Sequence, residues 1–150
     1  MSYSNEEKFL HESHESENIP ETLFTGTNLE YAQRMLNEHG VYRQETTGRK
    51  THLTDKPYVA YSAALNRGMA YNATPVLLIV DSKTPQIRVE KSKRIGFQDD
   101  YLADEIPENA IKGAYKVKAT DASKFALMDN PIRELNEQFE KVQLCTSKDK

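Results

Sequence analysis

The sequence predicts an α+β fold, a single lobe in which split mixed or antiparallel sheets are flanked by helices. A continuous apolar run at residues 75–80 has the composition of a central strand covered on both faces. Two earlier segments repeat apolar residues at helical spacing, each after a short strand signal. Pro85, Gly96 and Pro107 then divide the chain into short strands, a pattern suited to a mixed fold.

Length and composition fit one globular domain. The 150 residues are 37% hydrophobic and 29% charged, enough for one core and too few for two independent domains. The net charge of -3 argues against non-specific binding of duplex nucleic acid through a broadly basic surface. Without a signal sequence or an apolar run near the about 20 residues of a membrane span, we expect a cytoplasmic protein with no membrane partner.

Four regions follow from the composition along the chain. Residues 1–20 are rich in Ser, Glu and Asn and predict a mobile polar tail, because they bury too little apolar area to offset their ordering entropy. Residues 21–120 form the expected domain, residues 121–144 the C-terminal helices that pack on it, and residues 145–150 a second tail. The single cysteine, Cys145, lacks the spacing of a zinc site, and we expect no metal.

The domain opens with a predicted strand at residues 22–24 that runs into Gly26. Asn28 is the expected N-cap of the first helix, which Gly40 ends. A second strand ends at Thr54, and a helix opened by Pro57 runs towards Gly68. Shorter strands are expected around residues 87–89, 101–102 and 115–117.

Asn130 and Pro131 predict the start of a last helix that extends to residue 144. Ile132, Leu135, Phe139 and Val142 would share one face of it. This face is expected to pack on the domain, and binding of a partner protein is the alternative.

Three short strings hold the candidate chemistry. LFTGT, at residues 23–27, ends a strand and puts Gly26 where a backbone can approach a ligand without a Cβ in the way. THLTDKPYVAYSAA, at residues 51–64, is a strand that feeds a helix with closely spaced alanines. DDYLADEIPENAI, at residues 99–111, offers five carboxylates around a strand.

In this order, with PVLLIVDS between the second and the third, the strings resemble the ADP-ribosyltransferase superfamily. The closest resemblance is to the C-terminal lobe of the RNA 2'-phosphotransferases, in segments that match residues 52–54, 75–81 and 106–107 here. It extends from Leu23 to Ile111. Ala63, a small residue where protein-modifying relatives place an aromatic one, favours the RNA-type branch.

The resemblance implies that NAD is bound as a substrate. The backbone of Gly26 would bind the nicotinamide amide, and His52 would stack on nicotinamide or its ribose. Thr25 stands where most relatives have histidine, so its shorter hydroxyl would reach the adenosine ribose only through water. Thr27 completes the string, and Arg67 is placed to hold the NAD pyrophosphate, with a solvated helix face as the alternative.

The resemblance also implies a catalytic carboxylate. The bond between nicotinamide and ribose breaks through an oxocarbenium-like state, as in glycoside cleavage. Asp100 would accept a hydrogen bond from a ribose hydroxyl and stabilise the developing charge beside His52. Asp99 and Glu105 are alternatives for this role.

Two functions are therefore expected. The first is an NAD-dependent ADP-ribosyltransferase that modifies a protein or nucleic acid, in a small format that suits a toxin, an effector or a phage-encoded modifier. The second, which Thr25 motivates, is a catalytically degenerate module of the same fold that binds NAD or phosphorylated RNA.

Overall fold

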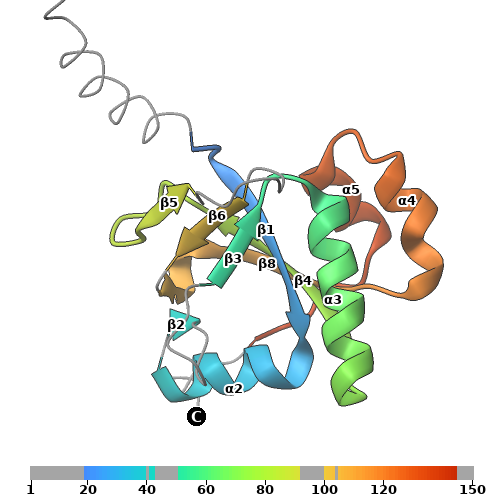
Figure 1. Ribbon diagram of the computed structural model, residues 1–150, viewed down its shortest axis with the longest axis horizontal. Helices are drawn as coiled ribbons and strands as arrows, with labels where there is room; N and C mark the ends of the chain where they lie inside the picture. The colour runs from blue at the N-terminus through green and yellow to red at the C-terminus, as the bar shows by residue number, and fades with distance from the viewer. Residues whose placement is uncertain (1–18, 40, 43–50, 92–99, 104, 145–150) are drawn as a thin grey trace, which may run out of the picture.

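The computed structural model describes residues 19–39, 41–42, 51–91, 100–103 and 105–144 (Figure 1). The strands are β1 (Thr22–Asn28), β2 (Val41–Tyr42), β3 (Thr51–Thr54), β4 (Pro75–Asp81), β5 (Val89–Lys91), β6 (Asp100–Ala103), β7 (Ile106–Pro107) and β8 (Ile111–Lys116). The α-helices are α2 (Leu29–His39), α3 (Pro57–Tyr71), α4 (Ala122–Ala126) and α5 (Pro131–Gln138), and short 3-10 turns cover Glu108–Ala110 and Ala119–Asp121.

The fold is α+β, as the sequence predicts. Six strands form one sheet in the order β5-β6-β3-β1-β4-β8, and β2 pairs with β7 in a separate two-stranded sheet. Each pairing between described strands is antiparallel. The apolar run forms β4, which lies between β1 and β8 and has its five inner residues buried. The prediction of a central strand covered on both faces is confirmed.

Within the six-stranded sheet, the pairing between β1 and β3 is short. Strand β1 pairs with β4 along its whole length, from Thr22 opposite Asp81 to Asn28 opposite Pro75. It pairs with β3 at one register position, Phe24 opposite Thr54. We call the part of β1 beyond that position, residues 25–28, the split, because it has no register partner in β3 among the described residues.

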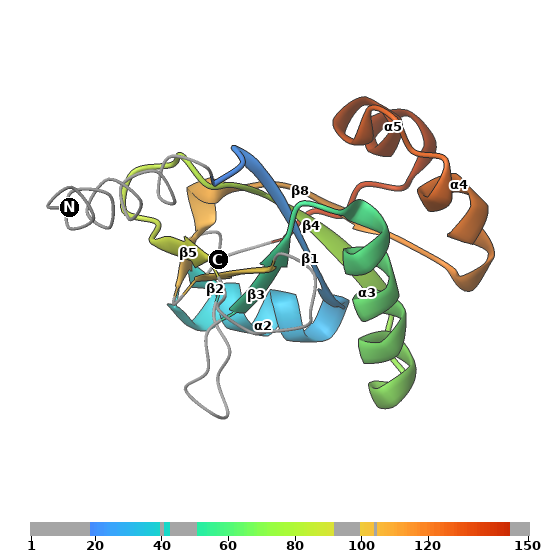
Figure 2. The same ribbon diagram turned by 45° about the horizontal axis from the view of Figure 1, so that its top comes forward.

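Two apolar clusters cover the two faces of the sheet. Figures 1 and 2 show that α2 and the helices α3 to α5 lie on different sides of it. The first lies on the α2 side and contains Leu36 of that helix, and the second lies under α3, α4 and α5. Successive β4 residues alternate between the clusters, as a strand buried on both faces requires. The result is three layers with the sheet in the middle.

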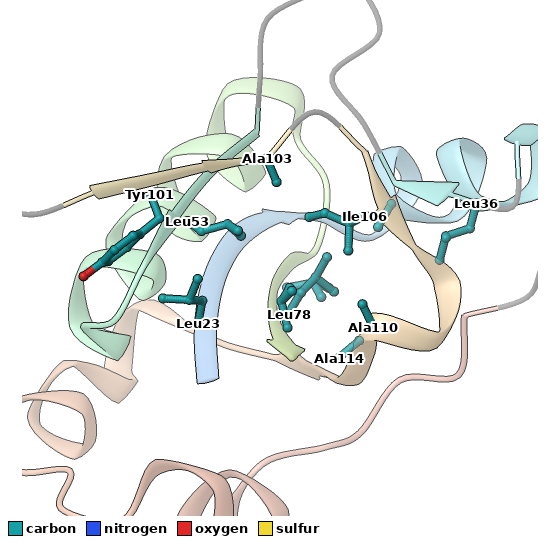
Figure 3. Close-up of a cluster of buried hydrophobic side chains, with 12 residues drawn as sticks. Leu23, Leu36, Leu53, Leu78, Tyr101, Ala103, Ile106, Ala110 and Ala114 are labelled. Carbon is teal, nitrogen blue, oxygen red and sulfur yellow. The ribbon is translucent and has the colours of Figure 1, made fainter. Parts of the chain in front are cut away.

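Figure 3 shows the first cluster, in which side chains from separate strands meet on one face of the sheet. Leu23, Leu53 and Leu78 come from β1, β3 and β4, and each is at most 1% exposed. Ile106 of β7 and Leu36 of α2 are buried against the same group. This cluster joins the two parts of the sheet on either side of the split.

The helices begin and end by local hydrogen bonds. Asn28 is the N-cap that the sequence predicts, since its Oδ1 accepts from the backbone N–H of Tyr31 at 2.8 Å. Helix α3 continues past Gly68 and ends at Tyr71, and the backbone N–H of its left-handed C-cap residue Asn72 (φ 52°) points to carbonyls of the last turn. Gly68 instead allows close packing, because a Cβ there would lie 2.5 Å from Cγ of Pro75.

The last helix is shorter than predicted. It ends at Gln138, and the following segment is extended, with the N–H of Lys116 donating to Glu140 O at 3.0 Å and that of Val142 to Ala114 O at 2.7 Å. Phe139 packs against the second cluster and Val142 against the first, on opposite faces of the sheet. A helix to residue 144 would have put both side chains on one face.

The first described residues pack on the domain. Described contacts begin at Ile19, which packs against the first cluster, and Ser82 Oγ donates to Pro20 O at 2.5 Å. Residues 19 and 20 thus contact the rest of the described chain. The rest of the predicted N-terminal tail, residues 1–18, and the predicted tail at 145–150 lie outside the described residues, as does Gly40.

Two buried tyrosines hold the α4–α5 region on the domain. Tyr61 stacks on Phe125 with ring centroids 4.4 Å apart, and its hydroxyl donates to the carbonyls of Lys118 at 2.7 Å and Ala119 at 3.0 Å. The Tyr115 hydroxyl is bonded to Asn136 Oδ1. Burial raises the pKa of Tyr61 above its ordinary 10.0, with a further increase from the nearby Asp121 carboxylate, and burial also raises that of Tyr115.

These shifts predict a loss of stability in alkali. Above about pH 10 the unfolded chain releases tyrosine protons that the folded chain keeps, so the free energy of unfolding falls until the pH passes the raised pKa values. Tyr61→Phe should flatten this fall, although removal of the hydroxyl costs about 1 kcal/mol at neutral pH. Urea unfolding at several pH values measures both effects.

Tyr71→Phe is the control, since Tyr71 is 72% exposed. A pH dependence above pH 10 that is the same in the Tyr61→Phe and Tyr71→Phe variants would contradict the prediction.

Candidate functional site

The three strings form neighbouring strands, although they are far apart in the sequence. LFTGT lies in β1, the second string forms β3 and the start of α3, and the third includes β6 and β7. The register puts Phe24 opposite Thr54 and Thr54 opposite Asp100. One row across the sheet therefore contains a residue from each string, and this row borders the split.

Gly26 makes a close contact, but with the protein itself. A Cβ on this residue would lie 2.1 Å from Ala60 O and 2.4 Å from Ala64 N, both in the backbone of α3. The sequence interpretation placed a ligand next to this glycine on the side that has no Cβ. The structure shows helix backbone there, so Gly26 allows α3 to cross β1 at short range.

Thr25 and Thr27 point away from α3. Leu23 belongs to the first cluster and Phe24 to the second, so strand alternation puts both threonines on the α2 side, opposite the face on which α3 crosses Gly26. Their exposures are 2% and 1%. Neither hydroxyl is available to a ligand on the α3 face, and their predicted role in NAD binding has no support there.

Arg67 lies against the backbone of the predicted site. It is half-buried on α3, and its Nη1 donates a hydrogen bond to the carbonyl of Gly26 within the split. The carbonyl of Arg67 itself accepts from Asn28 Nδ2 at 3.4 Å. The structure thus brings together two residues predicted to bind NAD and adds Asn28, whose link to α3 across 39 residues has no signal in the sequence.

His52 lies on the other side of the split. It is exposed, pairs with Leu102 of β6, and stands two residues before Thr54, as Gly26 stands two residues after Phe24. Residues two apart in a strand face the same way, so His52 and Gly26 are on the α3 face of the sheet. The predicted pair therefore lies on one face of the sheet, with Gly26 in the split and His52 in the neighbouring strand β3.

The candidate carboxylates differ in position. Asp100 begins β6 and is the residue of the third string in the row that reaches β1. Glu105 is exposed and lies beyond the other end of β6, outside that row. Asp99 lies outside the described residues. The register thus favours Asp100 over Glu105 as the residue beside the split.

Most of the other basic residues near the second and third strings cannot be placed. Those before His52 and beside the third string lie outside the described residues: Arg43, Arg49, Lys50, Lys93 and Arg94. Lys91 is described, exposed, and on the edge strand β5, which β6 and β3 separate from β1. Arg67 is thus the predicted basic residue that the structure connects to the split.

A groove elsewhere on the molecule contains none of the residues predicted to bind NAD. Its volume is about 930 Å³, and it lies between the start of α2, the C-terminal turn of α3 and the end of β8. Lys116 Nζ lies 3.2 Å from Glu140 Oε2, and Lys124 Nζ lies 3.6 Å from Asp121 Oδ1. Two of the lysines that line it are therefore already paired, which reduces its attraction for an anion.

Comparison with protein-family models and with curated proteins gave no match. Within the described part of the chain, no three His, Cys, Asp or Glu side chains are grouped to hold a metal ion. The described helices also include none with the length and apolar character needed to cross a membrane.

The contact of Gly26 with α3 predicts a strong effect of a methyl group. Gly26→Ala should lower the free energy of unfolding by about 3 kcal/mol, because helix backbone obstructs the new Cβ and α3 must shift. Gly113→Ala is the matched control, in which a Cβ meets the ring of Tyr115 at 2.7 Å rather than backbone. Urea denaturation should show the smaller loss in the control, and equal losses would contradict the prediction.

Proposed function

We propose that this chain is an NAD-dependent ADP-ribosyltransferase with a lobe of the ADP-ribosyltransferase type, which modifies a protein or nucleic acid in the cytoplasm. The main support is the row Phe24–Thr54–Asp100, in which strings from three separate parts of the sequence become adjacent. The short pairing between β1 and β3 supports the proposal, because the resemblance implies sheets that separate. The small format suits a toxin, an effector or a phage-encoded modifier.

In the proposed reaction the bond between ribose C1′ and the nicotinamide nitrogen breaks, and its electron pair leaves with nicotinamide. The acceptor's nucleophilic atom forms a bond to C1′ and gives up its proton. Asp100 would accept a hydrogen bond from a ribose hydroxyl and stabilise the positive charge on the ribose, and His52 would stack on the leaving ring. Their positions on either side of the β3–β6 pairing are compatible with contact to one ligand.

The enzyme should release nicotinamide from NAD and transfer labelled ADP-ribose to a component of a cell lysate. Asp100→Ala should reduce nicotinamide release at least about a hundredfold, as loss of an electrostatic transition-state contact commonly does. Asp129→Ala is the control, since Asp129 is an exposed carboxylate in the segment before α5. Equal activity of the wild type and the Asp100→Ala variant would remove Asp100 from the mechanism.

A second candidate function is a module that binds NAD or phosphorylated RNA without turnover. The burial of Thr25 at 2% favours it, because the residue in the usual histidine position does not reach the α3 face of the sheet. The residues around Gly26 would then bind the ligand without catalysing its cleavage.

Calorimetry separates the two functions. The module should bind NAD, or RNA with phosphorylated ends, with no nicotinamide in the mixture after incubation and with an affinity that Asp100→Ala leaves within about twofold. Steady nicotinamide release by the wild type that the variant lacks would exclude the module.

A further inference from the structure

We infer that the acceptor is a protein and not a nucleic acid, and that an extended segment of it binds in the groove between the start of α2, the C-terminal turn of α3 and the end of β8. This inference rests on the proposed function and names its substrate class. A nucleophilic side-chain atom of the protein acceptor then forms the bond to ribose C1′ and loses its proton to solvent, while nicotinamide leaves with the electron pair.

The groove begins where the split ends. Leu29 lines it and directly follows Asn28, the last residue of the split. The N–H of Leu29 donates to the carbonyl of Thr74, which also lines the groove, at 2.9 Å. Gly26 and Leu29 are three residues apart, about 10 Å along an extended chain. A segment in the groove therefore lies next to the site proposed for NAD.

The groove is large enough for several residues of an extended chain. Its volume of about 930 Å³ is at the upper end of the range for ligand pockets, about 300 to 1,000 Å³. The half-buried apolar side chains of Leu29, Pro75 and Phe139 line it together with the exposed polar side chains of Thr74 and Gln138. Because a polypeptide segment carries side chains of both kinds, this lining fits one.

The charges in the groove are of both signs. Three lysines and three carboxylates line it: Lys116, Lys118, Lys124, Glu30, Asp121 and Glu140. A nucleic acid needs a surplus of cations along its path, because much of its affinity comes from neutralised phosphates. The formal charges of these side chains cancel, and the whole chain has a net charge of -3. The groove is therefore better suited to a polypeptide than to a polyanion.

Glu30 and Lys118 are the charges of this set that belong to neither of the two ion pairs in the groove. Glu30 is exposed on the first turn of α2, and Lys118 is exposed after the end of β8. The backbone of Lys118 is held by a hydrogen bond from its N–H to Asp121 Oδ2 at 2.9 Å. A cation of the acceptor would face Glu30 and a carboxylate would face Lys118, which together set the direction of the bound segment.

The test incubates the full chain with a cell lysate and NAD labelled in its ADP-ribose part, and then digests the products with protease or nuclease. Protease should remove the label from the macromolecular fraction, and nuclease should leave it there. Glu30→Lys and Lys118→Glu each place a like charge opposite the acceptor, so each should lower the ratio of transferred ADP-ribose to released nicotinamide about tenfold. Glu137→Lys and Lys83→Glu are the matched controls, because both residues are exposed and outside the groove.

The outcomes distinguish this inference from the proposed function. If the wild type releases nicotinamide but the label is only on nucleic acid, only on the chain itself or on no macromolecule, the inference is overturned while cleavage of NAD stands. Labelled protein with an unchanged ratio in both groove variants also overturns it. Thermal unfolding identifies a groove variant that does not fold, and the other groove variant then decides. If the wild type releases no nicotinamide, the proposed function is overturned as well.

Discussion

The close approach of α3 to β1 at Gly26 is the constraint on which the rest of the structure depends. Because this residue has no Cβ, the backbone of Ala60 and Ala64 can lie directly on the strand. That contact fixes the height of α3 above the sheet and brings Arg67 to the β1 backbone. It also positions Tyr61, through which α3 holds Phe125 and the segments that follow β8.

The same glycine contacts α3 in two ways. Its missing side chain allows helix α3 to pack closely, and its carbonyl accepts a hydrogen bond from Arg67 of that helix. Position 26 is therefore constrained in two ways, because a Cβ would collide with α3 and the carbonyl needs a hydrogen-bond donor. Thr25 and Thr27 have no such contact with α3, because they face the first apolar cluster on the opposite side of the sheet.

Local sequence signals predicted most helices and strands, but they did not predict which strands lie next to one another. Asn28 as a cap, Pro57 as a helix start and the run that became β4 depend on neighbours a few residues away. The Asn28–Arg67 bond and the pairing of Thr54 with Asp100 join distant parts of the chain, and no periodicity encodes them. The strings suggested that these parts belong to one site, but not which strands are adjacent.

Two errors have a common physical origin. Gly68 resembled a helix stop and residues 131–144 resembled one amphipathic helix, since propensity and spacing are local properties. Tertiary packing gives a different result. Gly68 packs closely against Pro75, and Phe139 and Val142 pack against clusters on opposite faces of the sheet. Tertiary contacts thus overrode local preference where the chain passes from one layer to another.

The segment at residues 140–142 has a consequence for the order of assembly. It supplies backbone partners to β8, whose outer edge would otherwise present unpaired N–H and C=O groups. On the ribosome this segment emerges more than twenty residues after β8. Throughout that interval the nascent sheet has an open edge next to its most apolar strands, so newly made chains are more exposed to strand exchange with one another than finished ones.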